Sequence, residues 1–227
     1  MDKKSVHIIA YHGWGFDASF WNPLQDCFNS NTRFDAAERG YFSKKKEPSF
    51  DSDRTINVVL THSFGLHWCP DEILNQADHL MILGGFLNFH PSKEEENKRS
   101  KLLLRQMLTQ FVDSPETVLE QFYKNSFHPS PSVLESPKNL KHDLLLSDLS
   151  CIQQDSQPQQ RIFDVSTVTI LHGSDDLIVP RKAARDMFHS LRYRSQYFEI
   201  MKAGHAFPVT HIEKCAEIIN TVMFKNV

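Results

Sequence analysis

All eight glycines of this chain lie just beyond short runs of apolar residues, and this placement constrains the fold more than any other feature. Most runs are too continuously apolar for strands with one solvent-exposed face, so they predict a parallel sheet covered on both faces. Glycine permits tight turns and close backbone approaches, and ligands of open α/β sheets bind beyond the carboxyl ends of the strands. The glycines therefore indicate the sheet edge that holds the functional site, although any one of them alone fits an ordinary turn. The predicted strands are Ser5–Tyr11, Thr55–Thr61, His79–Leu83, Ser166–His172 and Ser195–Met201, with Arg33–Glu38 as a weaker candidate.

Helical patterns fall between or after these strands. Two of them are Arg181–Leu191 and His211–Phe224, and in the second the apolar residues recur at helical spacing. Alternation of strands and helices predicts an α/β fold with a mostly parallel, doubly wound sheet. The length of 227 residues is enough for a single domain with a sizeable core.

The stretch Phe86–His172 contains no glycine and interrupts this alternation with helical patterns. A first helix is expected from Pro91-Ser92, where Ser92 and Glu95 form a capping box. A second is expected to begin near Pro115, and a third to run around Leu140–Ile152. We predict that residues 91–160 form a helical lid, inserted into an α/β core of residues 1–90 and 161–227. The predicted apolar face of the first lid helix consists of Leu103, Leu104, Met107, Leu108 and Phe111.

Composition narrows the possible functions. A net charge of −3 and a pI near 6.4 give no reason to expect nucleic acid or an anionic membrane as a partner. No apolar run approaches the ~20 residues of a membrane span, and the amino-terminal apolar run fits a first strand better than a signal peptide. The four cysteines form no CxxC pair and no metal-ligand spacing, so we expect reduced, mostly buried thiols in a cytoplasmic protein without a metal. We also expect the protein to be a monomer.

Ser63 is the first candidate for chemistry, because it stands where a predicted strand turns into a helix. A serine at such a turn projects its hydroxyl from the top of the sheet, and Gly65 lets the backbone turn tightly. The pattern is G-x-S-x-G with Thr61 in its first position, and Pro70 is expected to shorten or kink the following helix. On its own this motif fits an ordinary strand-end serine better than a nucleophile.

The segment His12-Gly13-Trp14-Gly15 directly follows the first predicted strand. Acyl transfer develops an oxyanion that needs two aimed N–H donors. One is expected from the residue after the nucleophile, Phe64, and the other from an early strand-to-loop segment of this type, at the Trp14 amide. A plain glycine turn is the alternative.

The loops after the last two predicted strands contain a candidate carboxylate and a candidate imidazole, respectively. The first reads Gly173-Ser174-Asp175-Asp176, and its spacing to the following Val-Pro favours Asp176 over Asp175 as the partner of a catalytic histidine. The second places His205 directly after a glycine in the last strand-exit loop. The order Ser63, Asp176, His205 is the order of α/β-hydrolases and differs from both serine protease orders.

Together these motifs resemble the pimeloyl-acyl-carrier-protein methyl ester carboxylesterases of biotin synthesis, members of the α/β-hydrolase superfamily. The resemblance rests on His12–Gly15, Trp21, the Ser63 turn, Asp176–Pro180 and Gly204-His205-Ala206, and spans nearly the whole chain. Thr61 and His62 depart from the best-known members.

The resemblance implies hydrolysis of a methyl ester on a pimeloyl chain that an acyl carrier protein holds, with no metal or organic cofactor. Two rival enzymes on the same scaffold are an acyl thioesterase and a menaquinone-pathway lyase. A catalytically inactive fold that only binds a ligand or partner is a third alternative, which the complete Ser-His-Asp set opposes.

The first lid helix carries two further predictions. We expect its apolar residues Leu104, Met107, Leu108 and Phe111 to include the lining of an acyl channel, while at least half of them serve only helix packing. Lys98, Lys101 and Arg105 share a stripe about 120° from the apolar face. That stripe fits an acidic carrier protein, which it would attract by electrostatic steering, and it equally fits a solvated helix face.

Overall fold

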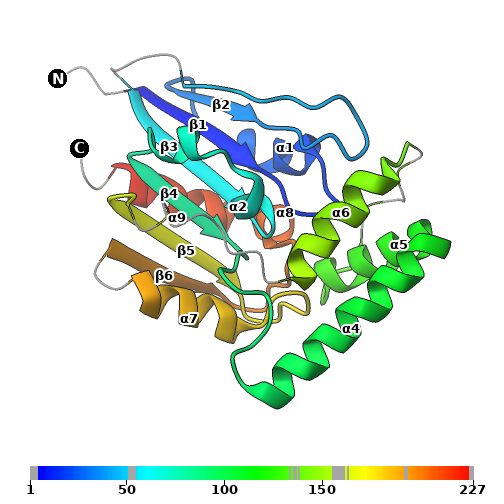
Figure 1. Cartoon of the computed structure of the whole chain (residues 1–227). Helices are drawn as coiled ribbons and strands as arrows, with labels where there is room; N and C mark the ends of the chain where they lie inside the picture. Colours follow the sequence, from blue (N-terminus) through cyan, green and yellow to red (C-terminus); the bar gives the residue numbers. More distant parts are fainter. Residues whose placement is uncertain are drawn as a thin grey trace.

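Six parallel strands form a single sheet in the order β2-β1-β3-β4-β5-β6 (Figure 1). The computed structural model describes residues 5–50, 55–132, 134, 137, 139–154, 162, 164–191 and 194–224. Each strand starts within about one residue of its predicted start, because the apolar runs that signal the strands are local features. The strands are β1 (Ser5–Tyr11), β2 (Thr32–Ala36), β3 (Thr55–His62), β4 (His79–Leu83), β5 (Thr167–Gly173) and β6 (Ser195–Ile200).

Successive residues of the strands enter two separate apolar clusters, one on each face of the sheet. In β1, Ile8 packs into the cluster that includes α9 (Ile212–Phe224), whereas Ile9 packs into the cluster that includes α7 (Arg181–Leu191). Figure 1 shows α7 and α9 on opposite faces of the sheet. Burial on both faces is why the inner strands are mostly continuous apolar runs, whereas the edge strands β2 and β6 are only partly buried and more polar.

The chain reverses its winding direction around β1. From β1 it moves to β2 on one side, and it then returns to β3 on the other side, so that β1 and β3 are neighbours. Such a switch point opens a crevice beyond the carboxyl ends of the two strands. The His12–Gly15 segment and Ser63 directly follow those two ends.

Three helices between β4 and β5 lie beyond the carboxyl edge of the sheet (Figure 1). They are α4 (Glu94–Asp113), α5 (Pro115–Phe127) and α6 (His142–Gln153). The predicted proline at the start of α5 is confirmed at Pro115. We call these helices the lid. The predicted return to the sheet near residue 160 lies outside the described residues.

Two details of the lid prediction are wrong. The capping box at Ser92 and Glu95 is absent, because α4 begins at Glu94 after Lys93, whose side chain makes no cap hydrogen bond. Leu103 does not belong to the inward face of α4 but is 57% exposed. The local capping pattern placed the N-cap of α4 at Ser92, one residue before the observed N-cap Lys93. Assigning every apolar residue of the segment to one face placed Leu103 on the wrong side.

The remaining helices are short. Pro70 has the expected effect, since the segment after Ser63 forms α2 (Gly65–Trp68) and α3 (Asp71–Leu74) with Pro70 extended between them. The 3-10 helix η1 (Ala18–Trp21) and α1 (Asn22–Gln25) precede β2, and α8 (Phe207–Thr210) precedes α9.

The four cysteines are free thiols with different exposures. Cys69 and Cys215 are buried, Cys151 is partly buried and Cys27 is exposed, so the expected burial holds for only some of them. Within the described ranges, none of the helices combines the length and the apolar character needed to cross a bilayer.

Candidate active site

Ser63 lies at a strained turn between β3 and α2. Its φ of +53° is in the left-handed region, which non-glycine residues rarely adopt, and its amide N–H donates to the Leu83 oxygen over 3.0 Å. Gly65 is required here, because a Cβ at this position would lie 2.2 Å from the Tyr11 main-chain oxygen. Thr61, where the family pattern has glycine, is fully buried in β3. The geometry is that of a nucleophile turn.

His205 and Asp176 form a buried hydrogen-bonded pair. Nδ1 of His205 donates to Oδ2 of Asp176 over 2.8 Å, and neither side chain is exposed to solvent. The other Asp176 oxygen accepts the amide N–H groups of Ile178 and Val179, both at 2.8 Å. Since Nδ1 carries the proton, Nε2 of His205 is left with a lone pair, and no described residue hydrogen-bonds to it.

The two adjacent aspartates have different surroundings. Burial by itself raises the pKa of the Asp176 carboxyl, but the charge and hydrogen bond of His205 and the charge of His172 outweigh burial and lower this pKa. Asp175 is exposed, and its carboxylate accepts the Ser174 hydroxyl over 3.0 Å. The structure therefore brings Asp176, and not Asp175, against His205.

Two buried histidines that sequence reasoning did not assign to the site also lie in it. His62 donates from Nε2 to the His205 main-chain oxygen over 3.1 Å, and its ring is 4.7 Å from the His205 ring. His172 donates from Nε2 to the Val179 oxygen over 3.0 Å and lies 3.7 Å from Asp176 Oδ2. Their positions next to Ser63 and Gly173 in the sequence were the only available signal.

The His12–Gly15 segment lies directly against the Ser63 turn. A Cβ on Gly13 would lie 2.9 Å from the Ser63 Cβ, so glycine is needed for this approach. Trp14 and Phe64, which were predicted to supply the oxyanion amides, are 3% and 4% exposed. Ser63 itself is 5% exposed, so it is largely shielded from solvent in this conformation.

The lid residues that were predicted to line an acyl channel lie on the inner side of α4. Leu104 and Phe111 are buried, and Met107 and Leu108 are partly buried against the same core. The Phe111 ring is 5.8 Å from the Trp14 ring. These contacts agree with the packing role that was expected for at least half of the set.

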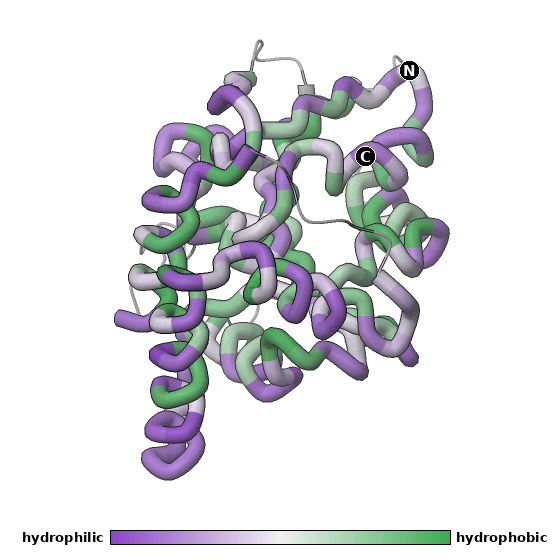
Figure 2. Tube along the Cα trace, turned by 90° about the vertical axis from the view of Figure 1, so that its right-hand side faces the viewer, coloured by the Kyte–Doolittle hydropathy of each residue, from purple (hydrophilic) through white to green (hydrophobic). Residues whose placement is uncertain are grey.

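The predicted basic stripe lies on the outer side of α4. Lys98 and Arg105 are exposed, and Lys101 is partly exposed. Lys98 also contacts Glu94 over 2.6 Å. Figure 2 shows hydrophilic residues along the amino-terminal part of α4, which extends away from the rest of the molecule.

An apolar cavity of about 250 Å³ lies beside the His12–Gly15 segment. Its walls include Phe16 and Phe20, whose rings lie 5.5 Å and 4.4 Å from the His62 ring. Tyr123 and Phe127 of α5 form another wall. Over the described residues, no three His, Cys, Asp or Glu side chains are grouped as metal ligands.

Comparison with known proteins gives one curated relative at low identity. No protein-family model matches the chain. The chain is 22% identical over 241 residues to the pimeloyl-[acyl-carrier protein] methyl ester esterase of Vibrio atlanticus (strain LGP32), covering 94% of this chain and 93% of that protein. The resemblance predicted from the motifs is thereby confirmed.

Solved structures identify the fold. A bromoperoxidase from Bacillus anthracis superimposes with a TM-score of 0.72 at 16% identity, covering 96% of this chain and 92% of that one. The esterase EaEST from Exiguobacterium antarcticum superimposes with a TM-score of 0.71 at 18% identity, covering 98% and 93%. The chain has the α/β-hydrolase fold, as the sequence predicted.

Proposed function

We propose that this chain is a serine hydrolase of carboxylic esters, with Ser63 as nucleophile, His205 as general base and Asp176 as the residue that orients the base. The observation that carries the proposal is the buried pair in which His205 Nδ1 donates to Asp176 Oδ2 over 2.8 Å. This contact selects the imidazole tautomer whose Nε2 can accept a proton. Ser63 supports the assignment through its strained turn beside His62, whose ring contacts His205.

The mechanism follows from these groups. His205 Nε2 takes the proton of the Ser63 hydroxyl while Oγ attacks the ester carbonyl carbon, and the amide N–H groups of Trp14 and Phe64 stabilise the oxyanion. The proton then passes from His205 to the leaving alcohol, and an acyl-serine remains. Water that gives its proton to His205 attacks this acyl group, and collapse of the second intermediate returns the proton to Ser63 and releases the acid.

For the substrate, we propose the methyl ester of a pimeloyl chain carried by an acyl carrier protein. The support is the 22% identity to the Vibrio esterase over nearly the full length of both proteins. The apolar surroundings of the site suit an aliphatic acyl chain, because the lid residues and the neighbouring cavity present mostly hydrocarbon. Methanol would be the alcohol released.

The carrier protein is proposed to dock on the outer face of α4, at Lys98, Lys101 and Arg105. Lys98 and Arg105 are exposed and Lys101 is partly exposed, whereas Leu104 and Phe111 of the same helix are buried. Complementary charge mainly accelerates encounter and is screened by salt. Because Ser63 is only 5% exposed, we expect lid side chains to move before the ester reaches it.

A fluorophosphonate probe together with p-nitrophenyl esters tests the esterase proposal. The wild-type protein should be labelled and should hydrolyse the esters, and Ser63→Ala should lose labelling and at least about 10⁴-fold in kcat. Ser147→Ala, which changes an exposed serine on α6, is the matched control and should keep both. A wild-type protein that is neither labelled nor active would instead favour an inactive fold that binds a ligand.

The substrate class needs a separate comparison. We expect the pimeloyl methyl ester on a carrier protein to be hydrolysed with a higher kcat/KM than short or long p-nitrophenyl esters. The protein should also restore growth of a biotin-requiring strain that lacks this esterase step. Activity on the nitrophenyl esters alone would retain the esterase and remove the pimeloyl assignment.

A further inference from the structure

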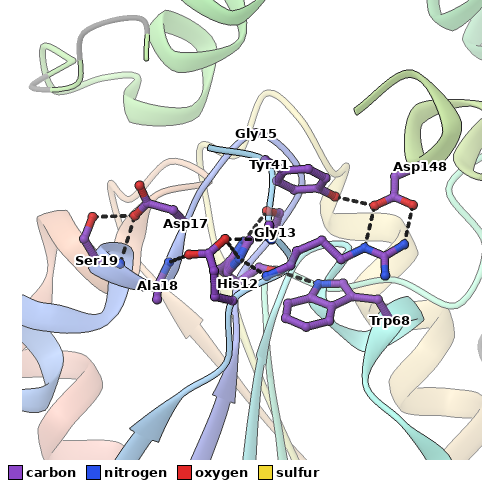
Figure 3. Close-up of polar contacts among 12 residues, drawn as sticks. His12, Gly13, Gly15, Asp17, Ala18, Ser19, Tyr41, Trp68 and Asp148 are labelled. Carbon is purple, nitrogen blue, oxygen red and sulfur yellow. Dashed lines mark hydrogen bonds and ion pairs between the residues drawn. The ribbon is translucent and has the colours of Figure 1, made fainter. Parts of the chain in front are cut away.

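A partly buried ion pair attaches the lid to the core close to the candidate active site. Asp148 on α6 has a side chain that is 3% exposed, and both of its oxygens accept hydrogen bonds from Arg39, over 2.8 Å and 2.7 Å. The Tyr41 hydroxyl donates to the same carboxylate over 2.6 Å. A bidentate guanidinium–carboxylate pair is strongly directional, and it is costly to break from one side when buried. We call these three residues the clamp (Figure 3).

The same helix has a second attachment to the His12–Gly15 segment. The Trp14 indole N–H donates to the main-chain oxygen of Leu145 over 2.8 Å, and Leu145 lies three residues before Asp148 on α6. One face of α6 is therefore held both by the loop after β2 and by the loop after β1. Both attachments involve the His12–Gly15 segment. Trp14 belongs to it, and the main-chain N–H of Arg39 donates to His12.

His12 connects the clamp to the peptide unit beside Ser63. Its Nε2 accepts the amide N–H of Arg39 over 3.1 Å, and its Nδ1 donates to the Gly13 oxygen over 2.9 Å. Only the neutral tautomer with the proton on Nδ1 satisfies both contacts. Glu38 Oε1 lies 3.6 Å from Nε2, which is too long for a competing hydrogen bond.

The Gly13 oxygen and the Trp14 N–H belong to one planar trans peptide unit and point in opposite directions. A hydrogen bond that fixes the Gly13 oxygen therefore also fixes the direction of the Trp14 N–H. That N–H is one of the two proposed oxyanion donors, and Gly13 packs directly against Ser63.

We propose that Asp148 and Arg39 are positioning residues for the Trp14 oxyanion amide, acting through the Arg39 main chain and His12. The lid helix α6 and the oxyanion site are then one connected unit, so that the amide is fixed only while α6 is seated on the core. This inference rests on the proposed esterase activity. It concerns the stabilisation of the oxyanion, which the Ser63, His205 and Asp176 side chains do not provide.

Kinetics on a small p-nitrophenyl ester test this role. Asp148→Asn replaces one of the two acceptor oxygens that Arg39 uses with an NH2 donor. Arg39→Lys keeps the charge but loses the bidentate fork. Each should lower kcat by about 10- to 100-fold and change KM by less than about threefold, because a misdirected donor weakens the transition state more than the bound ester. The double variant should be no worse than either single.

Two comparisons separate this role from general damage to the lid. Asp143→Asn makes the same substitution at an exposed position of the same helix and should leave kcat unchanged. His12→Phe should lower kcat by itself, and adding Asp148→Asn to it should cause no further loss. Additive losses in that double variant would overturn the route through His12.

The remaining outcomes are equally decisive. Wild-type kcat in both Asp148→Asn and Arg39→Lys, at unchanged melting temperature, would overturn the inference and leave the esterase proposal intact. A change confined to KM would also overturn it, because the clamp would then govern substrate access. A wild-type protein without esterase activity would reject the proposed function itself.

Discussion

The His62 imidazole donates a hydrogen bond to the His205 main-chain oxygen over 3.1 Å. The His62 ring also stacks on Phe20, with the ring centroids 4.4 Å apart. Burial, and then the nearby His205, lower the pKa of His62 well below its usual value, so that its ring stays neutral. A neutral donor at this position holds the His205 loop without placing a second positive charge beside the proposed general base.

His62→Phe should keep the ring stacking and remove the donor to His205. We expect kcat to fall by about tenfold with little change in KM, because the His205 loop loses one of its main-chain contacts. His211→Phe, at a partly buried histidine in the loop before α9, is the matched control. Wild-type kcat in His62→Phe would mean that the Ala206–Ser126 main-chain hydrogen bond, 2.8 Å long, is sufficient to hold this loop.

The adjacent aspartates provide a second test. Asp176→Asn should lower kcat by about 10⁴-fold, because the amide no longer selects the productive His205 tautomer. Asp175→Asn should cost little, since Asp175 is exposed and its carboxylate accepts the hydroxyl of the neighbouring Ser174. Steady-state kinetics on one p-nitrophenyl ester compare the two. The reverse pattern would assign the orienting role to Asp175.

Two residues on the inner side of α4 allow a packing role to be distinguished from a role in acyl-chain selectivity. Phe111 is fully buried against Trp14, so Phe111→Ala should lower the free energy of unfolding by about 3–5 kcal/mol. Met107 is only partly buried, so Met107→Ala should change the preferred acyl chain length with a smaller loss of stability. Urea unfolding and a series of p-nitrophenyl esters measure the two effects. An unchanged chain-length preference in Met107→Ala would leave this residue with a packing role alone.

Charge reversal tests the proposed carrier-protein surface. Changing Lys98, Lys101 and Arg105 to Glu should lower kcat/KM for a carrier-bound ester, most strongly at low ionic strength, and should hardly affect a small p-nitrophenyl ester. As a matched pair, Arg105→Glu on α4 should show this effect and Lys214→Glu on α9 should not. Equal losses on both substrates would indicate a damaged lid. No loss on either would place docking elsewhere.

Buried histidines should make stability depend on pH. Burial lowers the pKa of His79 to about 4, whereas its ordinary value is 6.5. Below pH 6.5 the His79 side chain is protonated in the unfolded chain, but in the folded protein it stays neutral until near pH 4. The free energy of unfolding is therefore highest above pH 6.5 and decreases as the pH falls from 6.5 to about 4. The slope is up to about 1.4 kcal/mol per pH unit for each such histidine, and His62 and His172 act in the same direction.

Urea unfolding at pH 7.5, 6 and 5 measures this slope. His79→Gln should flatten it, because the glutamine side chain can keep a hydrogen bond to Thr169 without titrating. An unchanged slope in His79→Gln would mean that other groups cause the acid sensitivity.

The sequence by itself determined the strands, their parallel arrangement and the three residues proposed for catalysis. Each strand signal is local, since it needs only a continuous apolar run and a glycine after it. Ser63, Asp176 and His205 could be found because every one of them follows a strand end, and parallel strands bring these ends to one edge of the sheet. Their order along the chain then distinguished them from the other serines, aspartates and histidines.

Only the tertiary structure decided which lid residues face the core and how the lid is attached. Leu103 and Leu104 are equally apolar neighbours, yet packing buries one and exposes the other. Arg39 and Asp148 are separated by 109 residues, and nothing in their local sequence marks them as partners. The physical reason is that a hydrogen bond across such a separation depends on where whole helices pack, whereas hydrophobic patterning specifies only which elements form.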